Sequence, residues 1–429
     1  MRSIALSSLA STLMLISCTS PETEKANHDN SSSMDLHRIF LETGLPYHTL
    51  PFDQLTPELL RDGIEQGMVE HRTEVDAITG DPGAPTFANT IEALERSGQL
   101  LGRASGALYN LNSSHTNEAL QALRSELAPK LAAHRDAINL DPKLFARIRT
   151  LHEQRGTLGL DASASRLLDR YYTDMVRGGA LLGPEDKKRL MALNEEESRL
   201  TTKFQDMLLA ETNASAVVID DPAQLDGMTP EEMQAAADAA REKGMEGKWL
   251  ITLVNTTQQP VLAVLKDRAT REKVHKASIA RGSRGGEHDN SELILRLAAL
   301  RAEKAALFGF PDHASYVLDD QMARTPAAAL KLLTGMVPAA TANARQEAAK
   351  LQAMMDKDIP GARLEPWDHA YYAEQVRKAE YALDEAAIKP YFALERVLND
   401  GVFHAAGVLY GLTFEPRSDV PVYHKDVRV

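Results

Sequence analysis

Thirteen histidines are the richest source of metal ligands in this chain of 429 residues, which has only one cysteine. A helix that binds zinc for hydrolysis carries His-Glu-x-x-His, because ligands four residues apart share one face and the glutamate can activate the bound water. No two histidines here are four residues apart, and His152-Glu153 is followed by Gln154, Arg155 and Gly156. The sequence therefore predicts no catalytic residue and no metal ligand within these residues.

The sequence also lacks the motifs of nucleophilic catalysis and of phosphate binding. The cysteine is Cys18, near the N-terminus, and neither a Gly-x-Ser-x-Gly elbow nor a Gly-x-x-x-x-Gly-Lys-Ser/Thr loop occurs. The glycine-rich segment 282–290 matches no phosphate cradle. It is predicted to be a flexible linker between helices, with movement at the mouth of a cleft as the alternative.

The densest aromatic cluster, in a chain with only 5% aromatic residues, surrounds Asp368. Its rings are Trp367, Tyr371 and Tyr372. Rings with phenol groups suit a wall that binds peptides, because they offer apolar surface and hydrogen-bond to carbonyls. These three residues are therefore predicted to contribute to a substrate-channel wall. The alternative is a helix start in which Asp368 is the cap and Trp367 a hydrophobic plug.

Helices must position these residues, because apolar residues recur at helical spacing and the helix formers Ala, Leu, Glu, Arg and Gln are plentiful. The sequence predicts a mainly α fold with a few short strands, in which short links produce an antiparallel array. Helices are expected at 57–78, 85–114, from 116 past 131, from 142, 162–176, 184–210, 229–243, 257–282, 326–356, 367–392 and 395–409.

A sharp helical hairpin is the clearest single element. A leucine stripe predicts a helix that begins at Asn290 and ends at Gly309, since Pro311 prevents it from resuming in register. Within this helix Glu292 can pair with Arg296 one turn further on. The corner is followed by a second helical piece at 312–318.

Strand signals are few. Two β-branched runs, 216–219 and 247–253, predict strands that pair into a small ribbon. The stretch 420–429 alternates apolar and polar residues, which is strand periodicity. A strand there would present an unpaired edge, which proteins normally cover. We therefore expect that the sequence is truncated and that its missing part supplies the partner strands.

Residues 1–18 are predicted to be an export signal. Arg2 supplies a positive start, and the apolar run 4–16 is too short for a convincing membrane span. The stretch 15–18, Leu-Ile-Ser-Cys, looks like the lipobox of a bacterial lipoprotein, which predicts lipid attachment at Cys18. An ordinary cleaved signal with a stray cysteine is the alternative.

Residues 19–35 are polar and predict a flexible tether ahead of a helical region at 36–429. Thr19 follows the cysteine where an aspartate would favour the inner membrane, so the predicted location is the outer membrane, facing the periplasm. The chain carries 61 acidic and 48 basic residues, a net charge of −13, which disfavours nucleic acid as a partner. Membrane contact through the lipid alone and a monomeric state are expected.

Six segments, in order along the chain, resemble the thimet oligopeptidase and peptidyl-dipeptidase family of zinc metallopeptidases, and are most similar to its bacterial peptidyl-dipeptidase branch. Six matches in the family's order are far more specific than any one of them. The segments are PFDQLTPELLRDGIEQGM (51–68), PTFANTIEALERSGQLL (85–101), NTTQQPVLAVLKDRATREKVHKASIARG (255–282), RAEKAALFGFPDHASYVLDDQMA (301–323), PWDHAYYAEQVRKAEYALDE (366–385) and VYHKDVRV (422–429).

The resemblance implies a neurolysin-like helical fold with a deep channel that admits short peptides and excludes folded proteins. In that family zinc polarises the scissile carbonyl and a glutamate activates the bound water, releasing dipeptides from peptide C-termini. The family's zinc helix follows the segment that resembles 422–429, so no ligand or base can be carried onto this chain. The expectation is the N-terminal, channel-wall part of an exported peptidyl-dipeptidase, with Zn²⁺ in the intact enzyme and no activity in these residues alone.

Two other hypotheses remain open. One is a non-catalytic helical lipoprotein that binds peptides or a partner protein. The other is a purely structural helical protein of the cell envelope, which would bind no peptide. Calorimetry with short peptides separates these two hypotheses, and the nucleotides after the codon for Val429 separate both from a truncated enzyme.

Overall fold

The computed structural model describes residues 35–382 and 385–429, and their contacts define two compact units. One unit contains the described residues up to Glu74, with Ser97–His115 and Arg417–Val429. The other contains Val75–Arg96 and Thr116–Pro416. Helices dominate both units, so the predicted mainly α class is confirmed. The predicted signal and Cys18 lie outside the described residues and remain predictions.

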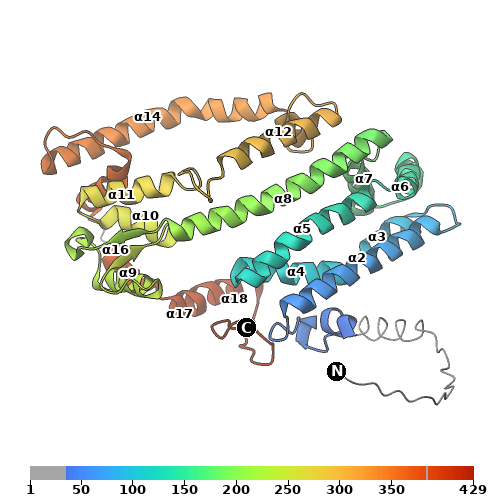
Figure 1. The fold of residues 1–429 in the computed structure, drawn as a ribbon, viewed down its shortest axis with the longest axis horizontal. Coiled ribbons are helices and arrows are strands. Elements are labelled where there is room, and N and C mark those ends of the chain that lie inside the picture. Colours follow the sequence, from blue (N-terminus) through green and yellow to red (C-terminus); the bar gives the residue numbers. More distant parts are fainter. Residues whose placement is uncertain (1–34, 383–384) are drawn as a thin grey trace, which may run out of the picture. The chain divides into compact units, whose positions relative to one another are not determined.

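The helices and strands follow the predicted order closely (Figure 1). The helices are α2 (Pro57–Gly80), α3 (Ala93–Arg96), α4 (Gln99–Ser114), α5 (Glu118–Asn139), α6 (Pro142–Gln154), α7 (Ala162–Arg177), α8 (Pro184–Ala214), α9 (Pro230–Glu242), α10 (Asn255–Val264), α11 (Arg268–Ile279), α12 (Ser291–Leu307), α13 (His313–Leu318), α14 (Pro326–Asp358), α15 (His369–Tyr381), α16 (Glu385–Ile388), α17 (Leu394–Arg396) and α18 (His404–Tyr410). In the described part of the chain, no helix combines the length and apolarity needed to cross a bilayer.

The first unit is built around α4 and the N-terminal part of α2, with Phe40, Leu60 and Leu108 fully buried. The predicted strand at 420–429 is wrong within this structure, because 411–429 form no strand. A turn interrupts the alternation, in which the amide of Val427 donates to the carbonyl of His424 at 3.0 Å. Alternation alone fixes which side chains share a face, whereas a strand also needs a partner edge for its backbone.

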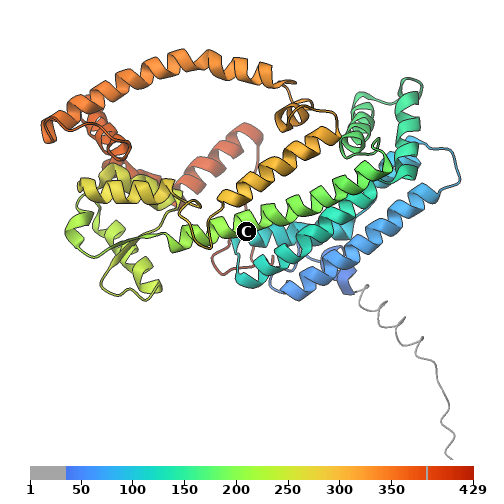
Figure 2. The ribbon, with the colours of Figure 1, turned by 45° about the horizontal axis from the view of Figure 1, so that its top comes forward.

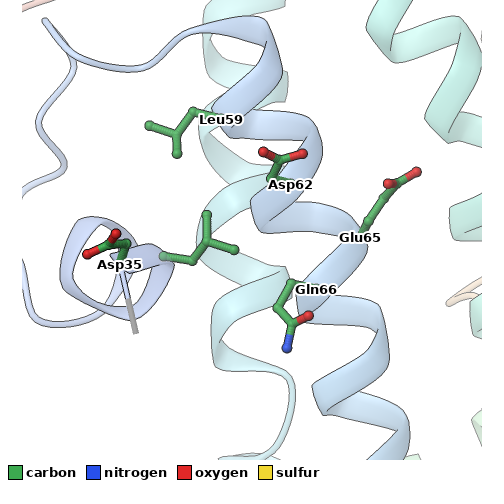
Figure 3. A pocket seen from close by; sticks show the side chains of 6 residues that line it. Asp35, Leu59, Asp62, Glu65 and Gln66 are labelled. Atoms are coloured by element: carbon green, nitrogen blue, oxygen red, sulfur yellow. The ribbon is translucent and has the colours of Figure 1, made fainter. Parts of the chain in front are cut away.

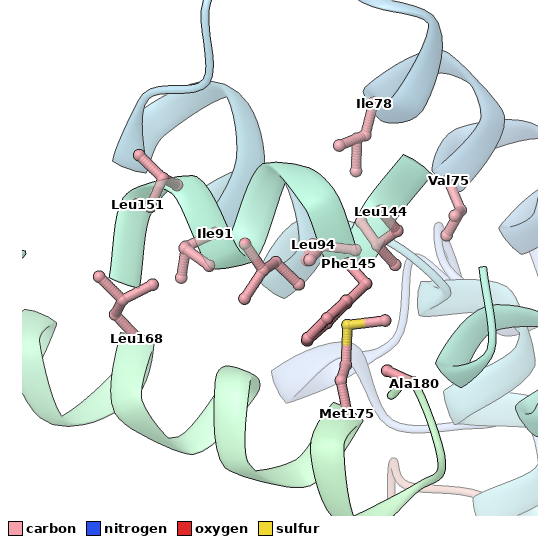
Figure 4. Close-up of a cluster of buried hydrophobic side chains, with 11 residues drawn as sticks. Val75, Ile78, Ile91, Leu94, Leu144, Phe145, Leu151, Leu168, Met175 and Ala180 are labelled. Carbon is pink, nitrogen blue, oxygen red and sulfur yellow. The ribbon is translucent and has the colours of Figure 1, made fainter. Parts of the chain in front are cut away.

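One hydrophobic core of the second unit lies where α6 and α7 pack together (Figure 4). Asp141 caps α6 by accepting hydrogen bonds from the amides of Lys143 and Leu144. Figure 4 shows Phe145 of α6 beside Met175 of α7 in this cluster. The core members are Val75, Ile78, Ile91, Leu94, Leu144, Phe145, Ile148, Leu151, Leu168, Met175 and Ala180.

The long helix α8 packs against α5 and α12 and connects most of the second unit (Figure 1). The predicted hairpin is confirmed as α12 and α13, but the predicted Glu292–Arg296 pair is not the one that forms. Arg296 instead makes two hydrogen bonds, of 2.7 and 2.6 Å, to the carboxylate of Glu196 on α8. A carboxylate on a packed neighbouring helix can present both oxygens to a guanidinium, which a residue on the same helix face does less well.

Glu197 on α8 adds a second link to the hairpin, since it accepts hydrogen bonds from Arg301 at 2.8 Å and Lys304 at 3.3 Å. Burial alone would raise the pKa of the Glu197 carboxyl, but the hydrogen bond from Arg301 and the charge of Lys304 outweigh burial and hold the pKa below its ordinary value. The folded-state pKa is therefore below the unfolded value. The ionised Glu197 carboxylate therefore stabilises the folded state above pH ~4.3, and this stabilisation is lost as the pH falls through the folded-state pKa.

We expect Glu197→Gln to lower the free energy of unfolding at pH 7 by about 1–2 kcal/mol, because two charge-assisted hydrogen bonds weaken. Urea unfolding at pH 7 and at about pH 3.5 measures this, and the difference from wild type should shrink at the lower pH. Glu185→Gln is the control, since that carboxylate also lies on α8 but is 85% exposed. Equal differences at both pH values would contradict the assignment.

The predicted ribbon is confirmed by β1 (Val217–Ile219) and β2 (Trp249–Ile251), which pair antiparallel with Val218 opposite Leu250. Beneath it lies a second hydrophobic core, which α10 and α11 also enter. Its buried members are Val217, Ile219, Leu225, Ile251, Leu253, Val261, Leu262, Leu265 and Val274.

Three predicted continuous helices are broken in the structure. The helix predicted at 367–392 ends at Tyr381, and Ala382 follows it in the left-handed region at φ +49°. The helix predicted at 85–114 divides at Ser97–Gly98, where Gly98 has φ +70°, a conformation that a glycine adopts without strain. The helix predicted at 257–282 divides into α10 and α11 around Leu265–Asp267, and Asp267 caps α11 by accepting from the amide of Thr270 at 2.7 Å. Helical periodicity continued across these last two breaks, so it could not reveal them.

Candidate functional site

A polar cluster in the second unit surrounds Asp368, whose side chain is fully buried. Arg268 donates to both carboxylate oxygens, with Nε–Oδ1 at 3.0 Å and Nη2–Oδ2 at 2.8 Å. Arg271, which is 1% exposed, donates from Nη2 to Oδ1 at 2.9 Å. Two guanidinium groups from α11 therefore enclose one carboxylate that lies immediately before α15.

Arg271 also satisfies backbone groups at the break between α10 and α11. Its Nη1 donates to the carbonyls of Leu265 at 2.8 Å and Lys266 at 3.0 Å. Those carbonyls lie where the helical ladder is interrupted, so a side-chain donor provides the hydrogen bonds that the helix does not. One buried side chain thus fixes this break and holds α15 to it through Asp368.

The electrostatics of Asp368 favour a structural role. Burial alone would raise the pKa of its carboxyl, but the hydrogen bonds from Arg268 and Arg271 outweigh burial and hold the pKa below its ordinary value. A carboxylate that is ionised, enclosed and fully hydrogen-bonded is a poor general base. The cluster positions α15, and we assign no chemical step to it.

The three predicted wall residues lie around this cluster in different environments. Tyr371 lies under the guanidinium of Arg271, with 4.3 Å from Cζ to the ring centroid. Trp367 is half-buried, and Lys276 lies over its ring at 5.3 Å. Tyr372 is 1% exposed and packs in a small core with Leu351 and Met355 of α14, so its ring offers no surface to a ligand in this structure. The wall role of Trp367 and Tyr371 stays a prediction.

The alternative offered for this segment is supported in part. Asp368 and Glu365 form a reciprocal capping box at a short 3-10 turn, Pro366–Asp368, and the amide of Glu365 donates to Oδ2 of Asp368 at 3.1 Å. The helix start is therefore real. Sequence reasoning missed Arg268 and Arg271, although Arg271 lies one turn before the buried Val274, on the inner face of α11.

Metal ligation has no counterpart among the described residues, where no group of three or more His, Cys, Asp or Glu side chains is arranged to hold an ion. His152 has a packing role: its ring stacks on Tyr172 at 3.9 Å between centroids, and Nε2 lies 3.2 Å from a carboxylate oxygen of Asp169. Glu287 and His288 lie 3.4 Å apart, and the carboxylate is 86% exposed. These residues do not make a zinc site.

The glycine-rich segment 282–290 forms a compact loop held by several hydrogen bonds. Asp289 accepts from the amides of Gly285 at 2.6 Å and Ser291 at 2.8 Å. The amide of Asn290 donates to the carbonyl of Gly282 at 2.8 Å. These bonds hold the loop at the start of α12.

The described residues also border two recesses that are candidate surfaces, one in each unit. In the first unit, a recess of about 370 Å³ is bordered by Asp35, Asp62 and Glu65. Figure 3 shows the carboxylates of Asp35 and Glu65 on opposite sides of Asp62, so the three groups do not converge on one point. In the second unit, a cavity of about 320 Å³ lies among α9, β2 and α10, with Glu232 and Lys389 3.8 Å apart in its lining.

Comparison with known proteins shows which family the chain resembles. Residues 261–429 match the sequence model of peptidase family M3. The chain is 44% identical over 396 residues to the dipeptidyl carboxypeptidase of Salmonella typhimurium, covering 92% of this chain and 58% of that protein. The dipeptidyl carboxypeptidase of Escherichia coli gives 44% over 394 residues, with the same coverage. Oligopeptidase A of Escherichia coli is 27% identical over 387 residues, covering 89% of this chain and 57% of that protein.

The chain is mainly α, and it resembles peptidase family M3 over residues 261–429 and two dipeptidyl carboxypeptidases over 92% of its length. These matches confirm the resemblance found in its sequence. The chain spans 58% of the length of the dipeptidyl carboxypeptidases that it matches.

Proposed function

We propose that this chain forms the helical channel-wall part of a peptidyl-dipeptidase, which releases dipeptides from the C-termini of short peptides. The observation that carries the proposal is 44% identity to two dipeptidyl carboxypeptidases over 92% of the chain. The name of those relatives describes removal of dipeptides from a carboxyl end. The name oligopeptidase A describes action on short peptides, which supports short peptides as the substrate class.

The contribution of this chain is structural and positional in this proposal. The cluster of Asp368, Arg268 and Arg271 fixes the start of α15, where Trp367 and Tyr371 are predicted to face the peptide. Family M3 enzymes use zinc, but the described residues do not provide a ligand set that fits it. We therefore assign no step of peptide hydrolysis to this chain. Lipid attachment at Cys18 and location at the outer membrane remain part of the proposal, on the sequence alone.

We expect the purified 429-residue chain, supplied with Zn²⁺, to release no dipeptide from an N-acetylated tetrapeptide above the rate without protein. Mass spectrometry of the products and metal analysis of the dialysed protein measure this. Intact Escherichia coli dipeptidyl carboxypeptidase is the positive control. Dipeptide release with one zinc bound per chain would contradict the proposal, and calorimetric binding of the peptide without cleavage would instead favour the non-catalytic binding protein.

A further inference from the structure

The N-terminal half of α14 carries an apolar surface that the described residues leave exposed. We call it the α14 stripe, and each of its residues is at least 51% exposed. At 100° per residue the five side chains occupy an arc of about 160° on one side of the helix. The stripe consists of Leu330, Leu332, Leu333, Met336 and Val337.

The C-terminal half of the same helix shows what such a surface does when it has a neighbour. Leu351 and Met355 are 4% and 0% exposed, because Tyr372 of α15 packs against them. Figures 1 and 2 show α15 beside this end of α14, and Figure 2 shows α14 as a gently curved helix. The contrast lies within one helix, so the exposure of the stripe reflects its surroundings and not its composition.

A contiguous stripe of this kind differs from the isolated exposed apolar residues that every protein carries. Helices with an apolar face of this width normally bury it against another element. The same unit exposes a second apolar group that is 66–75% accessible, comprising Tyr391, Phe392, Leu394, Val408, Leu409 and Tyr410. A neighbour that covered both groups would be large and itself apolar.

The comparisons indicate what that neighbour is. The α14 stripe lies inside the region that matches family M3, and the chain spans only 58% of the relatives' length. We propose that the α14 stripe docks against the portion of an M3 peptidase that this chain does not match, which in the proposed function is the portion that carries out catalysis. This inference rests on the proposed function, since it identifies the surface that joins the two portions.

Cysteine labelling tests the docking directly. The part of Escherichia coli dipeptidyl carboxypeptidase that this chain does not match would be joined after Val429 in a Cys18→Ser background. Met336→Cys reports on the stripe, and Lys331→Cys on the opposite face of the same helix is the matched control. Both cysteines should react rapidly with a soluble maleimide in the 429-residue chain. In the joined protein we expect about tenfold slower labelling of Met336→Cys and little change for Lys331→Cys.

Unchanged labelling of Met336→Cys in the joined protein would overturn the proposal. So would a joined protein that lacks a cooperative unfolding transition, because the added portion would then offer no complementary surface. Slow labelling of Met336→Cys in the 429-residue chain, with sedimentation as a dimer, would assign the stripe to a second copy instead. Dipeptide release by the joined protein is measured separately, so a protected but inactive protein would contradict the proposed function and leave the docking surface supported.

Discussion

Asp368→Asn is expected to lower the free energy of unfolding by about 3–5 kcal/mol, one of the two largest effects we foresee in this chain. The asparagine keeps the shape of the side chain but removes the negative charge between two guanidinium groups. Arg271 is 1% exposed, so its charge would remain buried without a compensating partner. Arg268 is 35% exposed and can turn toward water, which places most of the cost on Arg271.

Urea unfolding followed by circular dichroism measures the loss, and Asp226→Asn is the matched control. Asp226 also pairs with a cation beside the same helix break, Lys266 at 3.1 Å, but both side chains are 60% exposed. An exposed pair of this kind contributes about 0–1 kcal/mol. If Asp368→Asn cost no more than Asp226→Asn, the buried cluster would not hold α15 as we describe.

A second arm separates the lost charge from the lost packing. Combining Asp368→Asn with Arg271→Met removes both buried charges and fills similar volume. We expect the double variant to recover part of the stability lost by Asp368→Asn alone, because an unpaired buried charge costs more than the absence of the pair. A double variant that is less stable by the sum of the two single losses would show that the two residues act independently.

Most helices could be predicted from the sequence because their signals are local. Thr325 before Pro326 predicts the start of α14, and in the structure the Thr325 hydroxyl accepts from the amide of Ala328 at 3.2 Å. The leucine spacing predicts α12 in the same way, and Leu293, Leu297 and Leu300 are buried. Caps and apolar periods act within one or two helical turns, so a short stretch of sequence is enough to predict them.

The features that were missed depend on distant contacts. Arg271 hydrogen-bonds to Asp368, 97 residues away in the sequence, and no local pattern specifies that pairing. The break around Leu265–Asp267 has a local element as well, because Arg271 donates to the carbonyls of Leu265 and Lys266 from six and five residues away, but helical periodicity does not specify this contact. Arg296 likewise pairs with Glu196, 100 residues away, in place of the nearby Glu292. Tertiary partners decided both long-range pairings over local propensity.

Gly227→Ala is expected to lower the free energy of unfolding by about 3 kcal/mol or more, because the position is constrained in two independent ways. Gly227 has φ +106°, which an alanine adopts only with strain. An added Cβ would also lie 1.9 Å from the carbonyl oxygen of Val264, a backbone atom that cannot rotate away. The chain would have to separate 226–228 from the end of α10.

The control is Gly244→Ala, where φ is +71° and an added Cβ would meet nothing within 4 Å. Only the backbone strain applies there, so the loss should be about 1 kcal/mol. Thermal and urea unfolding of both variants measure the difference, and equal losses would show that the close approach to Val264 is not maintained.

Gly227 contacts the same break between α10 and α11 that Arg271 stabilises. Moving that segment should also weaken the hydrogen bonds from Arg271 to Leu265 and Lys266, so we expect Gly227→Ala and Asp368→Asn to be non-additive when combined.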